Sequence, residues 1–322
     1  MGVDKSLYSV VHAERLERAP RGLPLIISLE GFSDAGNAVD QLMDHILSDE
    51  SMTLLAEFSN DVFLDYRARR PTITFIKDHL ADYQPKKLSL YLGEDEIGEP
   101  FLFLAGYEPD FRWETFVREV SWIVQEFRVT VTTWVHAIPM PVPHTRPIGA
   151  TVSGSKQPLI DATSIWQPTT QLSASVGHAI EYALFRAGHE VVAFVLLVPH
   201  YLANTQYPHT LTASLKNIMN ATGLLFSTAE VEAREDAFTR QVTEQIRENG
   251  ESLEMVEALE QRYDDFVRER VREASETDEP DSLAEAEELP TADQLATQLE
   301  EYLARYWGEN PQEGNGPGIA GM

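Results

Sequence analysis

The stretch LPLIISLEGFSDAGNA, residues 23–38, decides the fold class. Its first part, residues 23–29, is a short and continuous apolar run, which is typical of a strand that is covered on both faces in a parallel sheet. Polar and glycine residues occupy 30–37, and from Ala38 onward apolar side chains recur at helical spacing. The stretch therefore predicts a strand, a tight glycine-containing turn and a helix.

The same order of elements continues to residue 222. We predict strands at 54–58, 72–75, 88–92, 100–105, 129–135 and 191–198, and helices at 113–127, 173–186 and 207–222. Short apolar strands that alternate with helices predict an α/β core with a largely parallel sheet in residues 1–226.

Residues 60–106 lie between the main units of this core and are expected to hold a hairpin insertion. An exposed apolar strand in it, residues 101–104, is a candidate oligomer contact, because an unpaired strand edge invites a second chain. The arginines of the preceding basic loop are candidates to meet acidic side chains of a neighbouring subunit; they are Arg67, Arg69 and Arg70.

Residues 227–309 are expected to form an acidic α-helical domain. Capping patterns precede its amphipathic helices, which we expect to pack on the core. Residues 230–309 hold 25 acidic residues against 8 arginines and no lysine. These charges either keep the protein soluble or belong to a lid over the sheet edge or to a docking surface for a protein partner. We also predict a mobile linker near 274–290 and a disordered tail at 310–322.

Composition excludes several kinds of site and surface. The 322 residues include no Cys, which removes disulfides, thiolate metal sites and Cys nucleophiles. A net charge of −27 provides no basic footprint for nucleic acid and disfavours anionic membrane surfaces. The longest strongly apolar run, residues 191–198, is far shorter than a bilayer span, and the N-terminus lacks the apolar segment of a signal peptide. We therefore expect a cytoplasmic protein without a nucleic-acid partner or a membrane span.

Three polar segments follow predicted strands, at 30–37, 136–147 and 200–209. In an open α/β sheet, ligands bind at the carboxyl ends of the strands, so these segments are expected to meet around a common hollow. Their polar side chains are the candidate ligand-binding residues: Glu30, Asp34, Asn37, His136, His144, Arg146, His200 and Tyr201.

Each segment also has a purely structural interpretation. Asp34 or Ser33 can simply cap the following helix. The proline-dense loop around His144 and Arg146 can hold its shape through bonds to backbone carbonyls, and most lone histidines are satisfied polar residues. Within these three segments the sequence contains no H-E-x-x-H, G-x-G-x-x-G or G-x-S-x-G pattern. It therefore predicts no metal and no cofactor, and it commits these residues to no particular reaction.

Three short motifs together resemble the proteasome assembly chaperone 2 family in its actinobacterial form. They are GFSDAGNA at 31–38, PHTRP at 143–147 and VPHYLA at 198–203. The resemblance covers about residues 5–305. It implies a mixed, mainly parallel sheet flanked by helices, like the core of purine nucleoside phosphorylases, with an insertion used in oligomerisation, a C-terminal helical lid and a homotrimer. Eukaryotic relatives help to assemble proteasome rings, whereas the actinobacterial branch has no agreed substrate.

Hypotheses from different classes follow. The first is a homo-oligomeric protein that binds a ligand or a protein partner and has an assembly or interaction role. The alternative is a hydrolase or phosphorylase-like enzyme that acts on a small polar molecule, nucleoside-like or amide-like, in a pocket covered by the helical lid. A third hypothesis is a ligand sensor whose lid moves on binding. The sequence leaves open whether the chain is an enzyme.

Overall fold

The structure is a computed structural model, and it describes the following parts of the chain: residues 7–10, 13–167 and 169–276. The chain divides into two compact units. All helices and strands named below belong to the larger unit, which comprises residues 1–166 and 174–276.

The larger unit contains both strands and helices along most of its length. The strands are β1 (Tyr8–Val10), β2 (Leu25–Glu30), β3 (Thr53–Phe58), β4 (Thr72–Ile76), β5 (His79–Gln84), β6 (Leu88–Glu94), β7 (Pro100–Tyr107), β8 (Thr132–Met140), β9 (Gly149–Gly154) and β10 (Val191–Pro199). The helices are α1 (Ala13–Arg18), α2 (Ala38–Leu47), α3 (Asn60–Phe63), α4 (Trp113–Glu126), α5 (Gln157–Thr163), α6 (Val176–Arg186), α7 (Pro208–Thr222), α8 (Ala229–Arg247) and α9 (Gly250–Glu276). The short 3-10 turns η1 (Ala35–Asn37) and η2 (His200–Leu202) follow β2 and β10.

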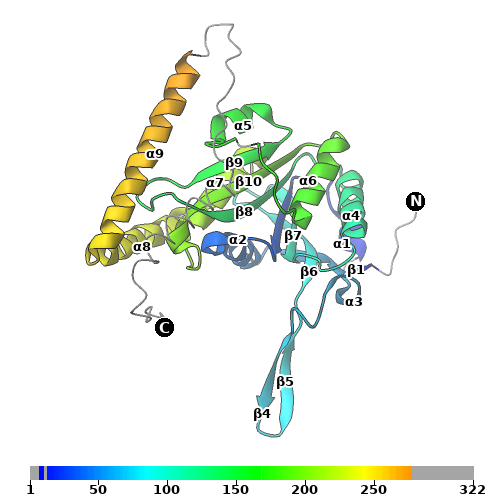
Figure 1. The fold of residues 1–322 in the computed structure, drawn as a ribbon. Coiled ribbons are helices and arrows are strands. Elements are labelled where there is room, and N and C mark those ends of the chain that lie inside the picture. The colour runs from blue at the N-terminus through cyan, green and yellow to red at the C-terminus, as the bar shows by residue number, and fades with distance from the viewer. Residues whose placement is uncertain (1–6, 11–12, 168, 277–322) are drawn as a thin grey trace. The chain divides into compact units, whose positions relative to one another are not determined.

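The main sheet has eight strands in the order β1-β3-β6-β7-β2-β8-β10-β9. Its centre, β7-β2-β8-β10, is parallel, and the remaining neighbours pair antiparallel. Helices lie on both faces of this sheet (Figure 1). The predicted α/β class with a mixed sheet flanked by helices is therefore confirmed.

The central strand β2 shows why the helices lie on both faces. Leu25 and Ile27 belong to one buried cluster, which α4 and α6 cover, whereas Ile26 belongs to the other cluster, which α2 and α7 cover. Successive side chains of a strand point to opposite faces, so an uninterrupted apolar run needs cover on both sides. This is the structure that residues 23–29 predict.

The hairpin insertion is shorter than the predicted range of 60–106. Only β4 and β5 form a separate two-stranded sheet, which projects from the main sheet below β6 in Figure 1. Strands β6 and β7 belong to the main sheet, and residues 101–104 in β7 are at most 1% exposed. The prediction of an exposed oligomer strand at 101–104 is wrong, because four consecutive large apolar residues leave no polar face for solvent.

Helices α8 and α9 pack on the core, as expected. Val231 and Val242 of α8 are buried in the cluster that contains α2 and α7, and Val256 and Leu259 of α9 are also buried. Among the described residues, no helix combines the length and the apolar character that crossing a membrane requires. The tail at 310–322 and nearly all of the linker near 274–290 lie outside the described residues.

Replacing Phe116 by Ala should lower the free energy of unfolding by about 3–5 kcal/mol, because it removes a large buried ring and leaves a cavity. Phe116 is 0% exposed, and its ring centroid lies 5.1 Å from that of Phe58 and 5.6 Å from that of Phe63. Urea unfolding followed by circular dichroism measures the change. Phe111→Ala removes a side chain that is 50% exposed and is the control. Equal losses in the two variants would contradict this account of the core.

Candidate functional site

The carboxyl ends of β2 and β8 form the crevice that an open α/β sheet offers to ligands. The chain that leaves β2 enters α2 on one face of the sheet, whereas the chain that leaves β8 first forms β9 in the same sheet and then α5, and only afterwards reaches α6 on the other face. In open α/β sheets, ligands bind in the crevice outside the carboxyl ends of the strands.

Strands β2 and β8 separate within their own length. Their ladder ends at the pair Ile27 and Trp134, although both strands continue beyond it. Further along, Ser33 Oγ donates a hydrogen bond of 3.0 Å to the carbonyl oxygen of Ala137 and joins the two segments again. We call the gap between these two connections the fork. It encloses a cavity of about 20 Å³ lined by Ile27, Leu29, Phe32, Ser33, Val39, Glu108, Trp134, Val135, His136, Ser175 and Gly177.

His136 is the buried imidazole of the fork. It is 5% exposed, and its ring stacks on Trp134 with a centroid distance of 4.9 Å and an interplanar angle of 9°. Burial, with a smaller contribution from His178, lowers the pKa of His136 to about 3, so the ring is neutral at physiological pH. Neither ring nitrogen has a hydrogen-bond partner among the described residues.

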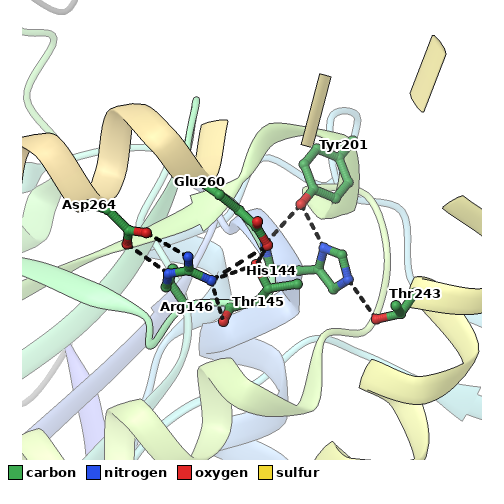
Figure 2. A network of polar contacts seen from close by, with 7 residues as sticks. All are labelled: His144, Thr145, Arg146, Tyr201, Thr243, Glu260 and Asp264. Atoms are coloured by element: carbon green, nitrogen blue, oxygen red, sulfur yellow. Dashed lines mark hydrogen bonds and ion pairs between the residues drawn. The ribbon is translucent and has the colours of Figure 1, made fainter. Parts of the chain in front are cut away.

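The proline-dense loop after β8 forms a second polar group, which binds the C-terminal helices (Figure 2). Arg146 donates to both carboxylate oxygens of Asp264 on α9, at 2.8 Å from Nε and 2.6 Å from Nη2, and its Nη1 lies 3.5 Å from Glu260. A guanidinium that binds a carboxylate in this two-pronged way is held in one orientation. We call this group the latch; it consists of His144, Thr145, Arg146, Tyr201, Thr243, Glu260 and Asp264.

His144 joins three elements within the latch. Its backbone N–H donates to Tyr201 Oη at 2.8 Å, the same oxygen lies 2.9 Å from Nδ1, and Nε2 lies 3.1 Å from Oγ1 of Thr243 on α8. Burial lowers the pKa of His144, which favours the neutral ring. In the tautomer that fits these contacts, Tyr201 donates its proton to Nδ1 and Nε2–H donates to Thr243.

His209 makes the same kind of histidine–threonine contact with α8, one helical turn before Thr243. Its Nε2 lies 3.1 Å from Oγ1 of Thr239, and its ring stacks on Tyr207 with a centroid distance of 4.6 Å. Burial also lowers the pKa of His209. Thr239 and Thr243 are four residues apart and therefore lie on one face of α8. That face is docked through two neutral histidines.

The other candidate residues lie apart from these two groups. Asp34 accepts the backbone N–H groups of Val39, at 2.8 Å, and Asp40, at 3.3 Å, so it caps α2, and burial raises its pKa. Asn37 has a left-handed backbone conformation (φ 53°) immediately before α2.

Glu30 and His200 also make contacts within their own chain. Glu30 forms an ion pair of 3.0 Å with Lys86, and it is partly exposed. His200 lies in η2 beside the ring of Tyr201, and burial lowers its pKa. Of the eight candidate residues, only His136 lines the fork cavity, whereas His144, Arg146 and Tyr201 are brought together in the latch.

The partners of these residues were missed from the sequence. Trp134 lies two positions before His136 on the same face of its strand, and this spacing could have predicted their contact. The four-residue spacing of Glu260 and Asp264 was the other available signal, because it places two carboxylates on one face of α9. Nothing local to Arg146 indicates that it binds a carboxylate more than 100 positions away.

The basic loop before the hairpin also binds within its own chain. Arg69 donates from Nη1 to the carbonyl oxygen of Glu108 at 2.7 Å, and its Nη2 lies 3.2 Å from Asp110. It is therefore engaged without a neighbouring subunit. The part of the chain that the structure describes contains no group of three His, Asp or Glu side chains that could hold a metal ion.

These features define a mixed α/β protein with a small, mainly apolar cavity at its strand ends and a C-terminal helical pair that packs on the core. A sequence model of the PAC2 family matches residues 28–246, and the chain belongs to this family. No curated protein matches it significantly.

Solved structures of actinobacterial proteins are similar over most of the chain. A Mycobacterium tuberculosis protein of unknown function is 35% identical, with a TM-score of 0.76 over 85% of this chain and 94% of that one. A protein of unknown function from Corynebacterium glutamicum is 31% identical, with a TM-score of 0.75 over 80% and 97%. A Mycobacterium tuberculosis proteasome-assembly chaperone homologue is 22% identical, with a TM-score of 0.66 over 73% and 100%, and shares the fold.

Replacing Arg146 by Lys should loosen α9, because an ammonium group cannot bind both oxygens of Asp264 in one plane. Amide hydrogen exchange in α9 should accelerate on the order of two- to fivefold, as expected for a partly exposed ion pair. The control is Arg240→Lys, which changes an exposed arginine of α8 in the same way. Unchanged exchange in Arg146→Lys would show that the latch does not hold α9.

Lowering the pH should loosen α8 before the rest of the core. The folded-state pKa values of His144 and His209 lie below the ordinary value of 6.5, because burial outweighs the nearby carboxylates. Their contacts therefore contribute fully above pH 6.5, and this contribution is lost as the pH falls through the folded pKa values. Amide exchange in α8, corrected for the intrinsic rate, should rise relative to α4 between about pH 7 and about pH 5. An equal pH response in a His144→Gln, His209→Gln double variant would contradict this.

Proposed function

We propose that this protein is a homo-oligomeric interaction protein with an assembly role, and that the β4–β5 hairpin is its contact surface. The observation that carries the proposal is the exposure of large apolar side chains on this hairpin. Phe75 is 67% exposed, Leu80 62%, Tyr83 54% and Ile73 49%. Monomeric proteins rarely display such a group, and a group of this kind marks a surface for association.

The geometry of the hairpin favours association. Phe75 and Leu80 are cross-strand partners, so they lie on the same face of the hairpin. An isolated two-stranded sheet is only marginally stable in water, and a second chain that covers this face would stabilise it. The hairpin and a different surface of the next copy would then form a heterologous contact, which produces a ring when the rotation between copies closes.

Charge supports a second copy of this chain as one partner. Residues 66–87, around the hairpin, hold six Lys and Arg against two Asp, whereas residues 229–276 in α8 and α9 hold 15 acidic residues against seven Arg. Basic and acidic regions on one chain attract each other between copies, which steers association. We favour a trimer as the closed ring, in the cytoplasm.

The relatives support an assembly role, in which the protein would bind a different protein in addition to further copies of itself. One mycobacterial relative is described as a proteasome-assembly chaperone homologue, and we propose that this chain uses the fold they share for protein binding. The alternative of a hydrolase or phosphorylase-like enzyme has less support. Asp34 caps a helix, and His144 and Arg146 hold α8 and α9, so these groups are already engaged.

A Phe75→Ser, Leu80→Ser double variant should lower the oligomer mass, because it removes two exposed apolar side chains from one face of the hairpin. Light scattering coupled to size-exclusion chromatography measures the mass directly. The matched control is Ile97→Ser, which replaces a side chain that is 66% exposed outside the hairpin, and it should retain the wild-type mass. If the double variant and the wild type have the same mass, the hairpin is not the contact.

A further inference from the structure

The fork contains a buried side chain whose hydrogen-bonding groups are unused. We infer that it is a binding site for a small uncharged molecule of the amide class, held by the neutral imidazole of His136. This site goes beyond the association of the hairpin, since no residue of the hairpin lines the cavity. Four properties of the fork lead to the inference: an unmet donor and acceptor, position, charge and size.

The unmet groups belong to His136. The residue is 5% exposed, and both of its ring nitrogens lack a partner among the described residues. Buried polar groups in folded proteins nearly always have a partner, because an unmade hydrogen bond destabilises the fold. A neutral imidazole offers one donor and one acceptor, so the missing partner is a group that can serve either.

The position of His136 makes these groups available to a ligand. The residue lies where β2 and β8 part, between the ladder pair Ile27 and Trp134 and the bond from Ser33 to Ala137. The N-terminus of α6 approaches the same cavity, since Ser175 and Gly177 belong to the lining. The fork thus lies beyond the carboxyl end of a parallel strand, where open α/β sheets bind ligands, and it gathers polar groups from several segments of the chain.

Charge determines the class of ligand. Glu108 is the only carboxylate in the lining, and no Lys or Arg belongs to it. One oxygen of Glu108 accepts the backbone N–H of Val176 at 2.6 Å. An anionic ligand would meet this carboxylate, and no cation in the lining would be there to bind it, so an uncharged molecule is favoured.

The small volume of the cavity means that one side chain, that of Phe32, must move before a ligand can bind. A cavity of about 20 Å³ has room for one water molecule. Phe32 lies in the turn after β2 and places its ring edge-on to His136, at 5.5 Å, and to His178, at 5.6 Å. Its ring can leave without breaking the ladder, and a planar amide then takes its place between the two imidazoles. An amide group carries both the donor and the acceptor that His136 requires.

The test is a titration of the full chain with acetamide, followed through the ring ¹⁵N signals of histidine. The signal of His136 is assigned by its absence in His136→Asn and by its failure to titrate down to about pH 5. Acetamide should shift this signal saturably in the wild type. Phe32→Ala should lower the half-saturation concentration by about tenfold or more, because the ring no longer has to be displaced.

Two controls make the test specific. Phe111→Ala removes an exposed ring elsewhere and should leave the half-saturation concentration unchanged. Sodium acetate has the shape of acetamide but carries a negative charge, and it should not shift the His136 signal. The inference is overturned if acetamide leaves this signal in place in both the wild type and Phe32→Ala, or if acetate shifts it equally.

Discussion

The burial of β2 on both faces is the constraint on which the rest of the structure depends. Its side chains alternate between two cores, so helices must cover both sides of the sheet. The segment that leaves β2 enters α2 on one face, whereas the segment that leaves β8 continues into β9 at the edge of the same sheet. The ladder of β2 and β8 stops at Ile27 and Trp134, and the fork opens beyond this pair. The cavity beside His136 therefore lies where two neighbouring parallel strands separate.

The fold class was predictable because a strand with a continuous apolar run is stable only when other elements cover both of its faces. That rule gives the correct strand at 23–29, and it also places residues 101–104 at the centre of the sheet. The prediction of an exposed strand at 101–104 is wrong because it relies on the position of these residues within the expected insertion and neglects their continuous apolar run. The extent of the hairpin was harder to predict, because β4 and β5 carry apolar side chains that no other described residue buries.

The candidate site was predictable only in part, since a sequence indicates which residues follow a strand but not what they will meet. His136 and His144 both come after the start of β8, yet one faces the fork and the other faces α8. The difference depends on Thr243, which lies 99 positions after His144. Such long-range partners are set by how the C-terminal helices pack, and local patterns carry no information about that packing.

The latch gives the acidic helices a structural role that is separate from their charge. Arg146 binds Glu260 and Asp264, and these are two of the 15 acidic residues in 229–276. Most of the negative charge is therefore not needed to dock the helices, and it remains available on a surface that the latch holds in place. The linings of the fork and the latch share no residue. The proposed ligand site and the docking of the helices therefore use different residues, although both groups lie at or after the end of β8.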